Sequence, residues 1–168
     1  MIASWIRRSL YLFSGRLACR IISDGEHPYL ERYFLFRAFG LTAYLHRFVG
    51  SDPDRGLHDH PWPWAFSVVL SGQYLERRRS GDRTVRYMNL LSGDTFHRVI
   101  MPPGSRSVWT LFVHSNARAK PWGFWHEAAE EGGSRVARWS AHSSSTPRDW
   151  WDQAPRGMHT EARQPADA

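Results

Sequence analysis

The chain has 168 residues, of which 42% are hydrophobic and 23% are charged. This length and composition suit one globular domain with its own hydrophobic core, and they exclude a fibrous or wholly disordered protein. The net charge of +6 comes largely from arginines scattered along the chain, without zinc-finger spacing or a basic helix. We read these arginines mainly as a solvated surface, so nucleic acid is not expected as a partner, whereas a small anion is compatible with the charge.

The N-terminal part, residues 1–28, is interpreted as a lead-in segment that contains a short helix. Trp5, Leu10 and Phe13 could line one face of this helix and pack on the rest of the domain. Arginines interrupt the apolar residues, and no run of about 18 apolar residues occurs, so neither a signal peptide nor a membrane span is expected. The single cysteine, Cys19, excludes an internal disulfide and allows a reducing compartment. We therefore expect a cytoplasmic protein without a membrane partner.

Residues 29–127 consist of short runs rich in β-branched and aromatic residues. Clusters of glycine, proline, serine and aspartate separate these runs at intervals of roughly 8–12 residues, a pattern typical of an antiparallel sandwich or barrel. Nothing in this region requires a long helix, which disfavours a parallel arrangement of alternating strands and helices. The sequence therefore predicts a compact all-β domain over this range.

Residues 128–168 have a polar composition, and we expect a partly disordered tail here. Three tryptophans contrast with the polar residues around them. They could dock the tail onto the barrel or onto a partner subunit, so a homodimer is one of the open alternatives. These tryptophans are Trp139, Trp150 and Trp151.

The segment around residue 58 carries the most informative chemistry. Residues two apart on a strand project to the same face, so His58 and His60 can present two imidazoles to one ion, while Asp59 points away. A third imidazole, His97, lies on a later strand that follows a glycine. Imidazole suits zinc, copper, iron and nickel, with manganese as a further option. An isolated histidine is more often a structural residue, but the second histidine-bearing strand favours a metal site made of His58, His60 and His97.

Both histidine segments carry glycines in a pattern that resembles the two sequence motifs of the cupin superfamily. The resemblance spans roughly residues 30 to 126, and the proline-glycine turn of the second motif comes after its histidine rather than before it. It implies an all-β cupin-type double-stranded β-helix (jelly-roll barrel) with a short N-terminal helix and an irregular C-terminal tail. It also implies one metal ion inside the barrel, held by the three histidines. The matching residues are Gly56, His58, His60 and Gly72 in the first motif, and Gly93, Asp94 and His97 in the second.

The first motif departs from the family pattern at one ligand position. Ala65 occupies the place of the usual glutamate, and alanine cannot bind a metal. The site is then either a three-histidine site, as in the thiol dioxygenase branch of cupins, or it takes a carboxylate from elsewhere. Glu76 is the nearest candidate for a fourth ligand, and it could equally be a surface residue that pairs with Arg77 or Arg78.

Other aromatic and histidine residues could line a pocket around the ion or orient its ligands, because a buried polar tip needs a hydrogen-bonding partner. The pocket candidates are Tyr44, His46, Trp62, Trp64 and His114. The remaining histidines are expected at the surface, and they are His27, His126, His142 and His159.

The candidate residues lead to one principal hypothesis for function and two alternatives. The principal hypothesis is a metal-dependent cupin enzyme, an iron(II) dioxygenase-like oxidoreductase on a small molecule, because three neutral imidazoles leave coordination positions open. Its cofactor would be one divalent metal ion, with Fe(II) favoured and Zn, Ni or Mn as alternatives. The other hypotheses are a non-catalytic module for a small anionic ligand, and a metal-independent sugar isomerase or epimerase.

The isomerase hypothesis requires a histidine that works as a base with the help of a carboxylate. No Asp or Glu is obviously aimed at His58 or His97 in the sequence, which ranks this hypothesis below the other two. The sequence assigns no catalytic residue.

Overall fold

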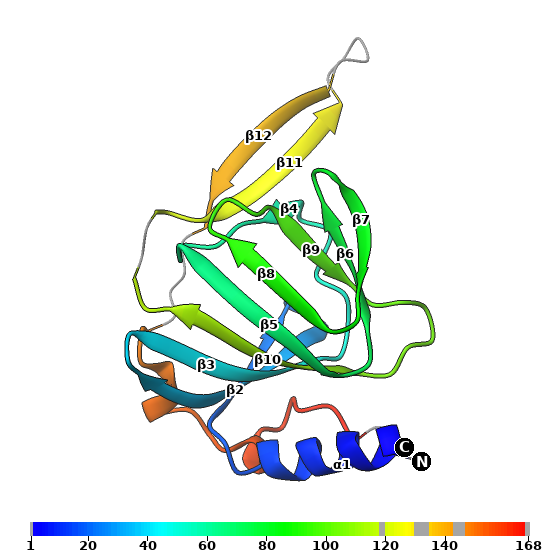
Figure 1. Cartoon of the computed structure of the whole chain (residues 1–168), viewed down its shortest axis with the longest axis vertical. Helices are drawn as coiled ribbons and strands as arrows, with labels where there is room; N and C mark the ends of the chain where they lie inside the picture. Colours follow the sequence, from blue (N-terminus) through cyan, green and yellow to red (C-terminus); the bar gives the residue numbers. More distant parts are fainter. Residues whose placement is uncertain (1, 118–119, 130–134, 143–146, 167–168) are drawn as a thin grey trace.

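The computed structural model describes residues 2–117, 120–129, 135–142 and 147–166. Within these residues the chain forms one α-helix, two single-turn helices and strands that are labelled β1 to β12. The strands form two antiparallel six-stranded sheets with a cavity between them (Figure 1). This architecture confirms the predicted all-β barrel with a short N-terminal helix.

Between β3 and β11 the chain crosses repeatedly from one sheet to the other, as expected for a jelly-roll barrel. In spatial order, sheet I contains β1 (Cys19–Ser23), β2 (Pro28–Ala38), β3 (Leu41–Phe48), β10 (Val108–Ser115), β5 (Trp64–Ser71) and β8 (Met88–Ser92). Sheet II contains β12 (Arg135–Ala141), β11 (Gly123–Ala129), β4 (Leu57–His58), β9 (His97–Ile100), β6 (Tyr74–Arg78) and β7 (Gly81–Val85). The helices are α1 (Ile2–Ser14), η1 (Trp150–Asp152) and η2 (Gly157–His159).

Sheet I buries hydrophobic side chains on both faces, so strand β3 is buried along almost its whole length. On its outer face, Leu10 and Tyr11 of α1 pack against Tyr33, Leu45 and Trp109. Between the sheets, a second cluster joins strands of both, and each fully buried side chain of this kind contributes about 1.5–3 kcal/mol to folding. That cluster contains Leu30, Phe48, Tyr74, Val85, Val99 and Val108.

The structure differs from the expected segment boundaries at both ends of the barrel. The helix ends at Ser14, and Cys19–Ser23 forms the edge strand of sheet I rather than part of a lead-in helix. Arg135–Ala141 forms strand β12, which pairs with β11 instead of forming an irregular tail, in a hairpin that extends away from the barrel (Figure 1). The expected disorder at residues 130–134 and 143–146 lies outside the described residues.

The C-terminal segment folds back onto the outer side of sheet I. The Arg163 guanidinium donates hydrogen bonds to the Tyr33 hydroxyl at 2.9 Å and to the Tyr11 carbonyl of α1 at 2.6 Å. The backbone N–H of Gln164 donates to the buried Glu31 carboxylate at 2.7 Å. The segment therefore satisfies polar groups of sheet I and ties the helix to the sheet.

The three tryptophans of the tail have different surroundings. Trp151 stacks on Phe34 with ring centroids 4.1 Å apart, and Trp150 lies 6.2 Å from the ring of Tyr44. Trp139, on β12, is 44% exposed. Trp150 and Trp151 thus pack on the inner side of sheet I, where they help to close one end of the cavity.

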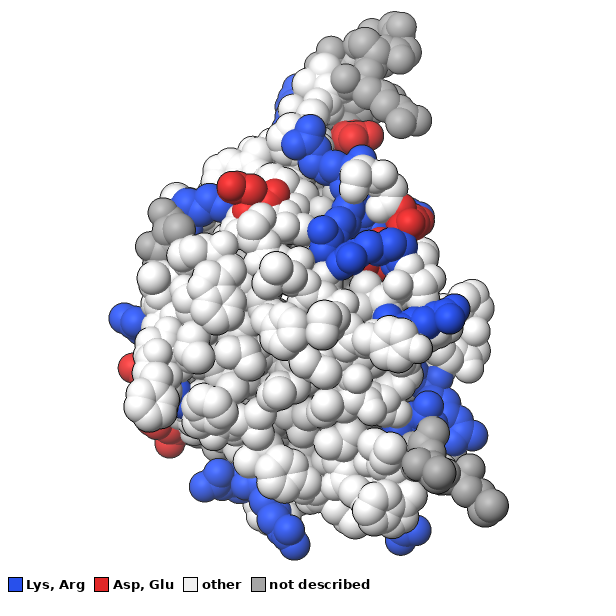
Figure 2. Space-filling model, in the orientation of Figure 1, with Lys and Arg blue, Asp and Glu red and all other residues white. Residues whose placement is uncertain are grey.

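The outer face of β5 and β8 is weakly charged. Figure 2 shows this face with few charged residues at its centre and most arginines towards its margins. Met88 and Leu90 of β8 are 63% and 68% exposed there. No helix in the described part of the chain has the length and apolar character that a membrane crossing requires.

We expect that Arg163→Ala destabilises the domain, because the substitution removes the hydrogen bonds that join α1, sheet I and the tail. Hydrogen bonds from a charged donor contribute about 1.5–3 kcal/mol, so the free energy of unfolding should fall by about that amount. Urea unfolding followed by tryptophan fluorescence measures the change. Arg156→Ala, at an exposed side chain of the same segment, is the matched control and should unfold like the wild type. Equal stability of the two variants would contradict a stabilising role for the tail.

Candidate metal centre

A glycine allows the first histidine strand to lie against its neighbour. Gly56 has a φ of +87°, and a Cβ atom at this position would lie 2.2 Å from the carbonyl oxygen of Trp125 on β11. Any other residue would force β4 and β11 apart. The close approach leaves His58 of β4 directly opposite His97 of β9 in the antiparallel ladder. The glycine of the first motif therefore acts through backbone packing and positions a histidine two residues later.

The three predicted histidines converge in the structure. One nitrogen of each of His58, His60 and His97 lies within 4.8 Å of the others. The Nε2 atoms of His60 and His97 are 3.0 Å apart. The imidazole rings of His58 and His97 have centroids 4.6 Å apart, and those of His58 and His60 are 5.2 Å apart. These three residues form a group that could hold a metal ion.

The spacing of the His60 and His97 nitrogens fits two ligands of one ion. Two nitrogens that each lie about 2.1 Å from a metal at a right angle are about 3.0 Å apart, which matches the distance between Nε2 of His60 and Nε2 of His97. Without an ion, the same contact is a hydrogen bond in which one imidazole donates. The donor set, three imidazoles, suits iron, zinc, nickel and copper and tolerates manganese.

Glu76 lies behind the histidines rather than at the surface. Its side chain is 0% exposed, and its Oε1 accepts a hydrogen bond at 2.7 Å from Nδ1 of His97. Arg78 and Arg83 donate to its Oε2 at 2.8 and 2.7 Å, and the Asn89 amide donates to its Oε1 at 2.7 Å. The expectation that no carboxylate is aimed at His58 or His97 was therefore wrong, and so was the alternative of an exposed Glu76.

The bond to Glu76 also fixes which nitrogen of His97 faces the site. Nδ1 of His97 points to the carboxylate, so Nε2 points to His60. Burial by itself would raise the pKa of Glu76, but the hydrogen bonds from His97, Arg78 and Asn89 outweigh it and hold this pKa below its usual value. The carboxylate is therefore ionised at neutral pH and accepts the Nδ1–H of the imidazole. A carboxylate in this position orients the ring and increases its basicity as a metal ligand.

The other two histidines of the group are neutral at physiological pH. Burial lowers the pKa of His58 well below its usual value, and the charge of His97 adds to the effect. Burial does the same for His60, with His58 as the next cause. Neutral imidazole is the form that binds a metal. Asp52 lies 3.9 Å from Nδ1 of His58, and its Oδ2 also accepts a hydrogen bond from the Val99 backbone N–H at 2.8 Å.

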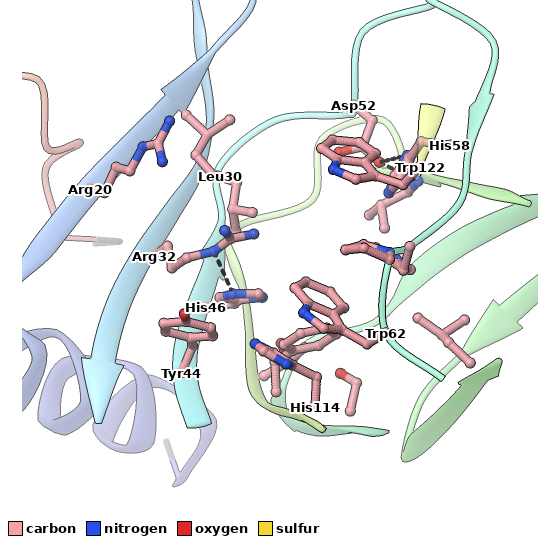
Figure 3. Close-up of a pocket in the computed structure, with 18 of the residues that line it drawn as sticks. Arg20, Leu30, Arg32, Tyr44, His46, Asp52, His58, Trp62, His114 and Trp122 are labelled. Carbon is pink, nitrogen blue, oxygen red and sulfur yellow. Dashed lines mark hydrogen bonds and ion pairs between the residues drawn. The ribbon is translucent and has the colours of Figure 1, made fainter. Parts of the chain in front are cut away.

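The histidines open into a cavity of about 450 Å³, which is within the usual range for small-molecule sites. Tyr44, His46, Trp62 and His114 line this cavity, on the side of sheet I and the loop before β5 (Figure 3). Trp64 is not among the lining residues and is 39% exposed, so its predicted place in the pocket is corrected.

His114 has a defined tautomer in the cavity wall. Its Nδ1 lies 2.6 Å from the Ser115 carbonyl oxygen, so Nδ1 carries the proton and Nε2 carries a lone pair. The Trp62 ring stacks on it with centroids 3.8 Å apart. Nε2 of His114 is buried without a hydrogen-bond partner among the described residues. Burial lowers the pKa of His114 to about 4, so the ring is neutral near pH 7.

Several lining residues were not identified from the sequence. His142, expected at the surface, lines the cavity and lies 4.2 Å from the Trp122 ring. Its position depends on the hairpin β11–β12, which carries the chain back to the barrel. Arg20, Arg32 and Trp122 also line the cavity, and no local signal in the sequence marks them.

The other three histidines lie away from the site. His27 and His159 are exposed, as expected. His126 is half-buried, and its Nε2 lies 3.1 Å from the Ser140 hydroxyl on the hairpin.

No protein-family model matches the sequence, and no curated protein matches it significantly. A sugar phosphate isomerase of the cupin superfamily from Silicibacter pomeroyi superposes with a TM-score of 0.53 at 12% identity, over 73% of this chain and 88% of its own. A cupin-2 domain protein from Rhodospirillum rubrum has a TM-score of 0.51 at 14% identity, over 62% and 72%. DMSP lyase DddQ from Ruegeria pomeroyi has a TM-score of 0.51 at 14% identity, over 64% and 60%. The chain therefore has the cupin fold, which confirms the resemblance drawn from its two motifs.

The metal-free protein should lose stability as the pH falls from 6.5 to about 4. The usual histidine pKa is 6.5, and that of folded His114 is about 4, so the unfolded chain binds more protons between these values. His46, His58 and His60 act in the same direction, because burial lowers their pKa values. Urea unfolding at pH 7.5 and pH 5 measures the loss.

The variant His114→Phe keeps the stacked ring but removes one of these titrating groups. It should lose less stability than the wild type between the two pH values, whereas the exposed control His159→Phe should behave like the wild type. The same pH dependence in wild type and His114→Phe would contradict this account of His114.

Proposed function

We propose that this protein is a metal-dependent enzyme that acts on a small molecule, with the ion bound by His58, His60 and His97. The observation that carries the proposal is the convergence of three imidazoles at the edge of a cavity. Three protein ligands leave positions open for water, oxygen or substrate, which is the arrangement of catalytic rather than structural metal sites.

Iron(II) is the favoured ion, and the favoured reaction class is a dioxygenase-like oxidation. The ion would supply Lewis acidity and, as iron(II), the capacity to activate oxygen. Zinc and nickel suit the same imidazoles, and manganese is a further option. The aromatic wall of the cavity would exclude bulk water from the substrate.

Glu76 is assigned as a positioning residue and not as the fourth ligand. Its two carboxylate oxygens accept hydrogen bonds from His97 Nδ1, Arg78, Arg83 and Asn89. Neither oxygen is therefore free to bind an ion held by the histidine group. It holds the His97 ring in one orientation and one tautomer. His58 and His60 have no such carboxylate bond at hydrogen-bonding distance among the described residues.

A metal-independent isomerase is the second candidate, and one observation favours it. The His97–Glu76 pair is the histidine and carboxylate that such an isomerase needs, with the imidazole as the base that moves a proton. In that case His58 and His60 would serve to bind substrate. Metal analysis separates the two candidates, because the isomerase works without an ion.

Protein purified without a histidine tag should contain close to one metal ion per chain. His58→Ala and His97→Ala should each lose it, because two imidazoles bind a divalent ion far more weakly than three. Elemental analysis by mass spectrometry gives the content, and the exposed His27→Ala is the matched control that should keep its metal. Full metal occupancy in both site variants would overturn the assignment, and oxygen consumption with small thiols and acids then tests the reaction class.

Glu76→Gln should weaken metal binding while leaving the ion's ligands in place. Loss of a carboxylate that orients a ligand histidine reduces metal affinity about 10–100-fold. Competition with a chelator of known affinity measures the change, and Glu26→Gln, at an exposed carboxylate, provides the control. Unchanged affinity in Glu76→Gln would exclude the positioning role, and complete loss of metal would instead indicate that Glu76 is a ligand.

A further inference from the structure

Two arginines stand opposite each other on the inner face of sheet I. Arg20 of β1 pairs directly with Arg32 of β2 in the antiparallel ladder, and Arg32 pairs in turn with His46 of β3. Figure 3 shows the two guanidinium groups on neighbouring strands at the cavity. Like charges that lie directly opposite each other destabilise a sheet. Packing alone therefore does not account for this pair.

Among the residues that the structure describes, no carboxylate pairs with these arginines. Within the described ranges, neither Arg20 nor Arg32 forms an ion pair with a carboxylate, and the groups that act on the charge of Arg32 are Tyr44, Tyr29 and Arg20 itself. Of the acidic side chains, only Asp52 lines the cavity among the described residues, on the side of the metal centre. The lining arginines are Arg20, Arg32, Arg37, Arg55 and Arg148.

Two other arginines of the cavity wall, Arg37 and Arg55, have partners of their own. Arg37 is paired with Asp149 at 2.6 Å. Arg55 lies 5.5 Å from the centroid of the Phe124 ring and donates to the Tyr29 hydroxyl at 3.5 Å. Of the lining arginines, Arg37 is thus the one with a carboxylate partner among the described residues, and Arg20 and Arg32 are the two that stand directly opposite each other in the ladder.

The Arg32 guanidinium is held in one orientation. Its Nε donates a hydrogen bond to Nε2 of His46 at 3.1 Å, and its Cζ lies 5.3 Å from the centroid of the Tyr44 ring. His46 can accept this bond because burial, together with the charge of Arg32, lowers its pKa well below the usual value and keeps it neutral. The two terminal nitrogens of Arg32 have no protein acceptor among the described residues. They form the planar pair of donors that matches a carboxylate or a phosphate.

A half-buried guanidinium that no carboxylate of the described residues pairs with is costly, and desolvation lowers the pKa of Arg32 as a result. Such a group is maintained where a ligand supplies the missing charge. The cavity that holds it also holds the three histidines, and the charge of Arg32 acts on both His58 and His60. A molecule seated on the arginine can thus reach the histidine group within one cavity of about 450 Å³.

We propose that the cavity binds a small organic anion, whose carboxylate or phosphate group is held by Arg32 and Arg20 while the rest of the molecule extends towards His58, His60 and His97. Two guanidinium groups on neighbouring strands select an anionic substrate over a neutral one. The metal-facing half of this proposal rests on the proposed function, whereas the anion site stands on the arginines alone.

The test uses the full chain, freed of metal by a chelator that is then dialysed away. Inorganic phosphate and malonate are the two probes, titrated by calorimetry at low ionic strength, and the tighter of the two identifies the anionic group. Charge-assisted hydrogen bonds contribute about 1.5–3 kcal/mol, so Arg32→Gln should weaken binding of that probe about 10–100-fold. Arg20→Gln should weaken it in the same direction. Arg86→Gln, at an exposed arginine outside the cavity, should bind like the wild type.

Arg32→Lys is the control for loss of binding through a folding defect, because lysine keeps the positive charge but lacks the paired donors of the guanidinium group. It should retain the thermal stability of the wild type and bind the probe more weakly than the wild type. No binding of either probe to the wild type would overturn the proposal, and so would wild-type affinity in both Arg20→Gln and Arg32→Gln. Equal weakening in Arg86→Gln would also overturn it, because the probe would then bind general surface charge.

This design tests the proposed anion site and the proposed metal site independently. The metal content of the purified protein and the affinity of the metal-free wild type for the anion are measured independently of each other. Anion binding without metal binding would reject the proposed function and keep the anion site. Metal binding without anion binding at the arginines would reject the anion site and keep the metal centre.

Discussion

The buried carboxylate of Glu76 joins the two sheets and the candidate metal centre in one hydrogen-bond network. It lies on β6, accepts from His97 on β9 in the same sheet, and accepts from Asn89 on β8 in the other sheet. A buried charge of this kind is tolerated only when its partners surround it, and Arg78 and Arg83 complete the set. The histidine orientation, the closure of the barrel and the ionisation of the carboxylate therefore depend on the same contacts.

Histidines and arginines both line the cavity, and desolvation has a different consequence for each kind of side chain. The histidines lose their charge, since burial lowers the pKa values of His46, His58 and His60 well below the usual value. Arginine keeps its charge at any physiological pH, so Arg20 and Arg32 retain a charge with which no carboxylate of the described residues pairs. This contrast distinguishes the end of the cavity that holds the histidine group from the end that holds the two arginines.

The polar interior is compatible with a stable domain because sheet I has a second hydrophobic core on its outer side. Tyr33 and Trp109 are 0% and 1% exposed there, under helix α1, and the C-terminal segment ties this helix to the sheet through Arg163. Burial of hydrophobic side chains on the outer face stabilises the sheet, and this offsets the cost of the polar side chains on its inner face. The helix and the tail are thus part of the structural basis of the site, although neither supplies a metal ligand among the described residues.

The sequence by itself determined the β-rich character of residues 29–127, the cupin resemblance and the group formed by His58, His60 and His97, because side-chain alternation and glycine positions are local properties of the chain. Only the tertiary structure decided the rest. The partner of Glu76 follows from the register between β6 and β9, and alternation misplaced Trp64 because the proline-rich bend at residues 61–63 interrupts the strand. Whether a charged group finds a counter-charge depends on strands brought together from distant parts of the chain, so the sequence could count arginines but could not show which of them lack partners.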